Sequence, residues 1–180
     1  MSDSSFTSMI EHLSQSALPV QALVTGFGYL LGILFFMIGI KKLKTIADYR
    51  ARSNSQIPMI VPAAYFIGAA VLFYVPVAIN VASTTAFGAG NILAYQKLST
   101  YSVLGSMVLI IQTAGVIWFV RGTALLVNAS NPGIQHGAKG LTFLIAGILA
   151  LNFEGTVSTI NTVMQWIGSL TMAFKGNLGY

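Results

Sequence analysis

Long, mostly apolar runs alternate with short polar segments along this chain. The runs occupy residues 20–40, 57–81, 101–127 and 140–160. A helix that rises 1.5 Å per residue needs about 20 apolar residues to cross the hydrocarbon core of a bilayer. The pattern therefore predicts an all-α, polytopic membrane protein that forms one domain, with four transmembrane helices arranged as two hairpins. We expect the less apolar residues 1–19 and 161–180 to form amphipathic or interfacial tails.

Two residues interrupt the apolar pattern in the second half of a run. Pro76 lies late in the second run, where its missing N–H group predicts a kink. Glu154 interrupts the fourth run, which reaches spanning length only if the helix continues past it. We expect residues 161–174 to extend this fourth helix or to lie in the membrane interface, and not to form a fifth span.

The positive charges predict how the hairpins lie in the membrane. Seven of the nine Lys and Arg residues lie in or beside the two segments that join the runs pairwise, namely Lys41, Lys42, Lys44, Arg50, Arg52, Arg121 and Lys139. Because positive residues stay in the cytoplasm, both hairpin loops are expected there, with both termini in the periplasm. The N-terminal tail carries Asp3 and Glu11 and no basic region, so the first run is expected to insert as an uncleaved signal.

Small residues mark candidate helix-packing faces within the runs. Gly28 and Gly32 form a GxxxG pair, with Gly39 one heptad further on, and Ala64 and Gly68 repeat the four-residue spacing. Small residues let helix backbones approach closely in lipid, so we expect these positions to lie in helix contacts.

Two polar side chains are candidates for an intramembrane role. Gln112 lies near the middle of the third run, where it can bond across helices or face a polar groove. Glu154 is expected near the outer interface, partly hydrated, and a role in an ion or proton relay is the alternative.

Composition excludes several classes of function. Hydrophobic residues make up 55% of the chain and charged residues 7%, and the mean hydropathy is +0.77, which is unsuited to a soluble domain. We interpret the net charge of +5 as topogenic, so no direct binding of nucleic acid is expected. The chain has no Cys, and its two histidines, His12 and His136, fall on opposite sides of the predicted membrane. We therefore predict no metal, no cofactor and no enzymatic activity.

A short internal echo suggests that one hairpin arose by duplication of the other. NSQIP at residues 54–58 and NPGIQ at residues 131–135 occupy the same place in the two hairpins. FIGAAVLF and LIAGILAL then follow in the second helix of each.

Two stretches carry a resemblance to a known family. In the first, a basic segment leads through N-x-Q-I-P into a Gly/Ala-rich helix that ends in Pro. In the second, W-F-V-R-G is followed by N-P-G-x-Q-x-G-x-K-G. Together they resemble the DotE/IcmC (TraQ-like) inner-membrane proteins of type IVB (Dot/Icm or conjugative) secretion systems. The residues that match the family pattern, with expected roles in turn geometry and packing, are Gln56, Ile57, Pro58, Arg121, Gly122, Asn131, Pro132, Gly133 and Lys139.

The resemblance implies a non-enzymatic subunit of the bacterial inner membrane that contributes helix packing to a complex translocating protein or DNA. Its implied partners are the lipid bilayer, other inner-membrane subunits of the system, and further copies in a homo- or hetero-oligomer. Two other functions stay open. One is a pilin-like hairpin subunit, and the other is a small transporter or ion channel that uses Gln112 and Glu154.

Overall fold

The computed structural model of the chain describes residues 2–52, 59–88 and 103–177. All regular structure in these ranges is helical, so the predicted all-α class is confirmed for this part of the chain. The helices are α1 (Ser2–Arg52), α2 (Ile60–Phe73), α3 (Val75–Phe87), α4 (Val103–Ala129), α5 (Gly137–Leu151) and α6 (Phe153–Asn177).

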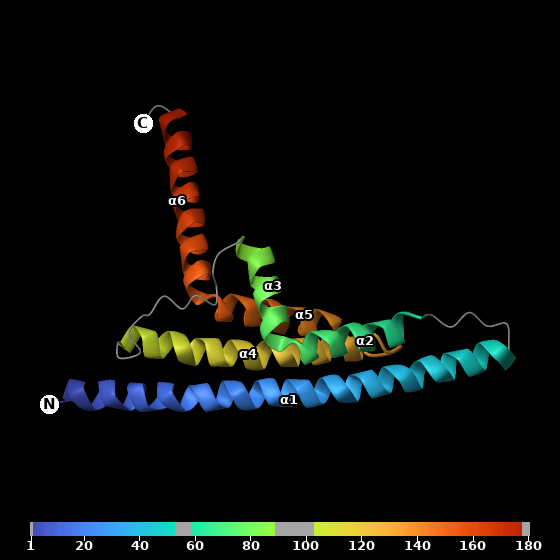
Figure 1. Cartoon of the computed structure of the whole chain (residues 1–180). Coiled ribbons are helices and arrows are strands. Elements are labelled where there is room, and N and C mark those ends of the chain that lie inside the picture. The colour runs from blue at the N-terminus through green and yellow to red at the C-terminus, as the bar shows by residue number, and fades with distance from the viewer. Residues whose placement is uncertain (1, 53–58, 89–102, 178–180) are drawn as a thin grey trace.

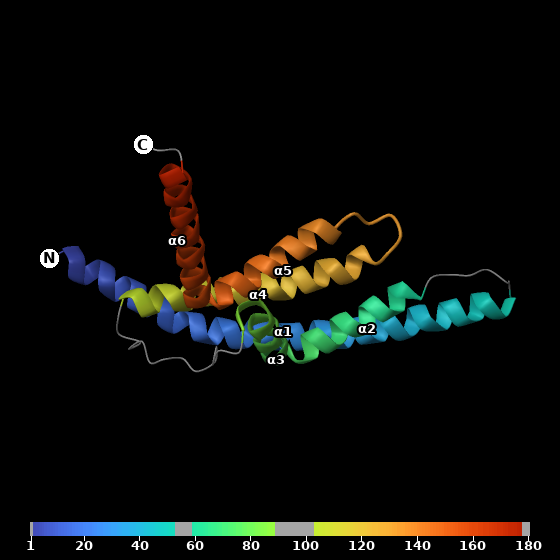
Figure 2. The ribbon, with the colours of Figure 1, turned by 90° about the horizontal axis from the view of Figure 1, so that it is seen from above.

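Four of the helices form an elongated layer, and the other two project from it. Helices α1, α2, α4 and α5 run along the long direction of the molecule, while α3 and α6 leave the layer on the same side (Figure 1). Seen from above, α2 lies along α1 and α5 lies along α4 (Figure 2). The extensive contacts of the structure follow this arrangement, since α4 packs most closely on α5 and α1 packs on both α2 and α4.

Helix α1 is much longer than the predicted span. It has 51 residues, which corresponds to about 76 Å at 1.5 Å per residue. The basic loop expected directly after residue 40 is therefore wrong, because residues 41–52 continue the same helix. Residues 2–19, expected as an amphipathic or interfacial tail, also belong to this helix. Residues 41–52 contain no Gly or Pro and consist largely of good helix formers, and Ile46 among them is buried.

A bend of 99° separates α2 from α3 within the predicted second run. Tyr74 is the junction residue, and Pro76 occupies the second position of α3, where a helix needs no N–H group. The break expected at Pro76 is present, but it turns the chain through a right angle. Residues 57–81 are consequently not one straight helix, and residues 57–58 lie outside the described part of the chain.

A similar bend of 96° separates α5 from α6 at Asn152. The Asn152 side-chain oxygen accepts the N–H of Gly155 at 3.2 Å, and the Thr156 hydroxyl donates to the carbonyl of Leu149 at 2.8 Å. These bonds satisfy backbone groups that the interruption leaves open. The expected continuous helix through residues 140–160 is therefore wrong, and residues 161–177 belong to a helix that begins at Phe153.

Two of the described helices have the length and hydropathy needed to cross a bilayer. They contain the segments Ser8–Ala51 and Gly105–Ala129. The number of candidate spans rises to four if each bent pair counts as one broken span.

The buried core lies where the α2–α3 bend meets α1 and α4. Leu72 and Val75, on either side of the bend, are 0% and 1% exposed, and they cluster with Phe119 and Val120 of α4. Helices α1 and α4 run parallel, since Gln21 pairs with Thr113 and Gly28 lies beside Val120. The core therefore joins the two antiparallel helix pairs into one body.

The two halves of the described chain follow the same plan. Tyr74 and Asn152 have nearly the same backbone angles, and each donates its N–H to the carbonyl four residues earlier. Adding 78 to a residue number in α2 or α3 gives its counterpart in α5 or α6, because 152 minus 74 is 78. This shift also aligns FIGAAVLF with LIAGILAL. Each half is thus a long helix, a shorter antiparallel helix, a right-angled bend and a projecting helix.

Candidate functional site

Three glycines of α1 line its contact with α2 and α3. A Cβ atom added at Gly32 would lie 3.2 Å from the carbonyl oxygen of Ala69 and 3.2 Å from the backbone nitrogen of Phe73. At Gly39 it would lie 3.1 Å from the ring of Phe66, and at Gly28 it would lie 3.2 Å from a methyl group of Val75. The close approach of the two helices therefore depends on the missing side chains.

The small residues of α2 have different surroundings. A Cβ added at Gly68 would overlap a methyl group of Val127 on α4, and Val127 is itself buried. Ala64 is only half-buried. Gly68 therefore marks the contact between the two antiparallel pairs, in which a side chain fills the space above the glycine.

The closest helix contact joins α4 and α5 and is lined with glycine on both sides. A Cβ at Gly122 would lie 2.6 Å from the backbone nitrogen of Leu144, and one at Gly147 would lie 2.7 Å from the backbone nitrogen of Phe119. Gly115 and Gly140 face the partner helix in the same way, with nearest backbone atoms at 3.0 Å and 2.9 Å. Sequence reasoning singled out only Gly122 here, as a family match. The available signal was the seven-residue spacing of glycines on each helix.

A polar cluster ties the antiparallel pairs together near the turn between α4 and α5. The Tyr65 hydroxyl accepts a hydrogen bond from the Asn131 side-chain amide at 3.0 Å and donates one to the side-chain oxygen Oδ1 of Asn128 at 3.5 Å. The Lys42 ammonium lies 5.5 Å from the centre of the Tyr65 ring, within cation–π range. Tyr65 is buried, so these bonds fix the position of a side chain that sequence reasoning did not select.

The predicted basic residues do not converge on one site. Lys41, Lys44 and Arg50 are exposed on α1, and Lys139 is exposed in the first turn of α5. Arg52 ends α1, and its side chain lies outside the described part of the structure.

Arg121 lies within α4 and not beside the turn that follows it, because α4 continues to Ala129. Its guanidinium lies 4.8 Å from the centre of the Phe143 ring on α5. Arg121 also lines a groove together with Leu23, Phe27 and Leu31, which belong to the apolar part of α1. A cation within an apolar helix segment is costly in a bilayer, and it is commonly held by a specific contact.

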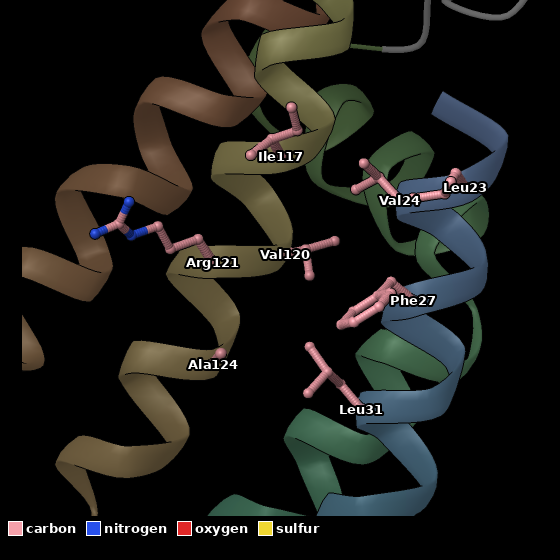
Figure 3. A pocket seen from close by; sticks show the side chains of 8 residues that line it. All are labelled: Leu23, Val24, Phe27, Leu31, Ile117, Val120, Arg121 and Ala124. Carbon is pink, nitrogen blue, oxygen red and sulfur yellow. The ribbon is translucent and has the colours of Figure 1, made fainter. Parts of the chain in front are cut away.

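An apolar groove of about 360 Å³ lies between α1 and α4, next to Arg121. Figure 3 shows the side chains of the two helices facing each other across the groove, with the Arg121 side chain turned away from it toward α5. The groove is lined by Leu23, Val24, Phe27, Leu31, Ile117, Val120, Arg121 and Ala124. Its walls offer contacts for apolar groups and little that would orient a polar ligand.

The two intramembrane polar candidates occupy different environments. Gln112 is half-buried, and its side-chain oxygen has no hydrogen-bond partner. The neighbouring Thr113 hydroxyl instead accepts the cross-helix hydrogen bond, from Gln21 at 2.9 Å. Glu154 is exposed in the first turn of α6, where its negative charge interacts favourably with the helix N-terminus.

The turn between α4 and α5 holds several residues of the second family motif. Gly133 has a φ of +86°, a conformation that other residues rarely adopt, which explains glycine at this position. Asn131 bonds Tyr65, as described above, and Pro132 is exposed. Gln56, Ile57 and Pro58 of the first motif lie outside the described residues.

No group of three His, Asp or Glu side chains suited to a metal ion occurs among the described residues. Comparison of the chain with protein families, with curated proteins and with solved structures finds no match.

Proposed function

We propose that the protein is a non-enzymatic subunit of a bacterial inner-membrane complex of the type IVB secretion or conjugation class. It contributes helix packing to the part of the complex that lies in the membrane. In this proposal each bent pair counts as one broken span, giving four spans in two hairpins. The basic residues 41–52 and the turn between α4 and α5 face the cytoplasm, and both termini face the periplasm.

One observation carries this proposal beyond the resemblance of motifs. Gly122 ends W-F-V-R-G, and Gly140 ends N-P-G-x-Q-x-G-x-K-G. A Cβ at Gly122 would lie 3.0 Å from the Gly140 carbonyl oxygen, so the two motifs meet in the closest helix contact of the structure. This close approach of residues from both motifs supports a role in helix packing.

The direct test uses a strain whose translocation depends on this gene, with Gly32→Leu as the variant. The added side chain would meet the α2 backbone, which lies 3.2 Å from the position of the new Cβ atom. Gly26→Leu is the matched control, because nothing lies within 4 Å of a Cβ atom added there. We expect both variants to insert into the membrane and only Gly32→Leu to lose complex assembly and translocation. Normal assembly and translocation in Gly32→Leu would refute the packing role.

A further inference from the structure

Arg121 and Lys139 form a pair of cations on one outer face of the α4–α5 hairpin, and both side chains are exposed. The Arg121 guanidinium lies 4.8 Å from the centre of the Phe143 ring. Lys139 comes one helical turn before Phe143, so it lies on the same side of α5. The side of α5 that packs against the core is a different one, because it carries Leu144 and Ile148. The cation pair therefore faces the surroundings of the hairpin.

The cation pair has no negative partner among the described side chains. The acidic side chains described are Asp48 of α1 and Glu154 of α6, and neither forms an ion pair with a member of the cation pair. Arg121 lies eight residues before Ala129, which places it about 12 Å inside the end of α4. A cation at this depth of a membrane span is costly, and an aromatic ring offsets only part of that cost.

The apolar groove between α1 and α4 lies directly beside the cation pair. Arg121 forms part of its wall, and along α4 the groove extends from Ala124 to Ile117. That direction leads from the α4–α5 turn toward the middle of α4. Figure 3 shows apolar side chains on both sides of the groove and the charged end of Arg121 outside it. A phospholipid has a matching arrangement, with its phosphate near the membrane surface and its acyl chains directed toward the bilayer middle.

We propose that the cation pair binds the phosphate of an anionic phospholipid, and that one acyl chain of the same lipid lies in the groove. A guanidinium can donate two parallel hydrogen bonds to a phosphate, and Lys139 adds a second positive charge one turn nearer to the membrane surface. Basic pockets between transmembrane helices bind anionic lipid headgroups in this way. The inference requires α4 and α5 to lie in a bilayer, and it does not rest on the proposed secretion function.

Quenching of tryptophan fluorescence by brominated lipid tests this site. Trp118 lies three residues before Arg121 on α4 and is 40% exposed, and Trp166→Phe removes the other of the two Trp residues of the chain. The full chain with Trp166→Phe is reconstituted in phosphatidylcholine vesicles. These contain increasing fractions of either phosphatidylglycerol or phosphatidylcholine that is brominated on its acyl chains. We expect brominated phosphatidylglycerol to quench Trp118 at a lower mole fraction than brominated phosphatidylcholine.

Loss of one charge should lower this preference about fivefold, because one basic residue near an anionic surface contributes about 1 kcal/mol. Arg121→Gln is the test variant. Lys44→Gln, which removes an exposed charge from α1, is the matched control and should keep the preference. Arg121→Lys guards against distortion of the site, because it keeps the charge and should retain more of the preference than Arg121→Gln.

Three outcomes would overturn the headgroup site. They are equal quenching by the two brominated lipids, an unchanged preference in Arg121→Gln, or an equal loss of preference in Lys44→Gln. Inorganic phosphate should reduce the quenching no more than sodium chloride of equal ionic strength. A larger reduction would assign the cation pair to a free anion and contradict the proposal.

The position of the acyl chain is tested separately with Ala124→Leu, because Ala124 forms part of the groove wall. The larger side chain should lower the quenching of Trp118 by brominated phosphatidylglycerol. Unchanged quenching in Ala124→Leu would overturn the placement of the acyl chain in the groove.

Discussion

Gly122→Ala is the smallest change that should disturb the closest contact of the molecule. The added Cβ atom would lie 2.6 Å from the backbone nitrogen of Leu144 and 2.9 Å from its Cα. Ordinary contacts begin at 3.4 Å, so α4 and α5 must separate by about 0.8 Å. No rotamer change relieves this clash, because the opposing atoms belong to the backbone.

The expected magnitude is the balance of two effects. Overpacking of a close contact costs about 1–3 kcal/mol. Replacing glycine with alanine inside a helix stabilises the helix by about 1 kcal/mol. Separation of α4 from α5 also weakens the neighbouring contacts at Gly115, Gly140 and Gly147. We therefore expect a net loss of about 1–2 kcal/mol in the free energy of unfolding.

Reversible unfolding of the purified protein in mixed micelles measures this difference. Gly26→Ala is the control, since nothing lies within 4 Å of the added Cβ atom there. It should stabilise the protein by about 0.5–1 kcal/mol, because it removes the conformational freedom of glycine without a clash. The reasoning would be refuted if Gly122→Ala were as stable as Gly26→Ala, or if Leu144→Ala restored the stability of Gly122→Ala.

Three further predictions concern contacts of different kinds. Gly68→Ala should destabilise the protein, because the added Cβ atom would clash with the Val127 side chain. Val127→Ala should recover part of that loss in a double-mutant cycle, and additive free energies of the two substitutions would contradict this. Asn152→Leu removes the acceptor of a backbone N–H and should cost about 1 kcal/mol. Spin labels on α5 and α6 should then show a broader distance distribution, whereas an unchanged one would count against a capping role. Tyr65→Phe removes the hydroxyl that accepts the hydrogen bond from Asn131 and should lower the free energy of unfolding by about 1 kcal/mol in the same assay. An unchanged free energy of unfolding would show that this bond does not stabilise the protein.

The apolar runs were sufficient to predict the all-α class of the described part of the chain, but they did not predict the bounds of its helices. A run of about 20 apolar residues has few alternatives to a helix in lipid, where every backbone group needs a partner. Pro76 also located a break, because its ring excludes one backbone hydrogen bond. The sharpness of that bend depends on packing against α1, α4 and α5, which the local sequence does not encode.

The second bend shows why the remaining features were missed. In the sequence, Asn152 is a single polar residue between Leu151 and Phe153 in an apolar run. In the structure, its side chain caps the following helix. Glu154, two residues later, drew attention because it is charged. The heptad glycines of α4 and α5 were missed for a related reason. Their role appears only when two helices that are separate in the sequence are placed face to face.

The proposed function is tested most directly by affinity purification of the tagged chain from native membranes, with identification of the proteins that co-purify. The proposal predicts that other inner-membrane subunits of a secretion or conjugation system are recovered with the wild-type chain. It also predicts that the Gly122→Ala variant recovers fewer of them than the Gly26→Ala control. Recovery of the wild-type chain without such subunits, together with ion flux through the purified protein alone in liposomes, would contradict the proposal and favour a small channel.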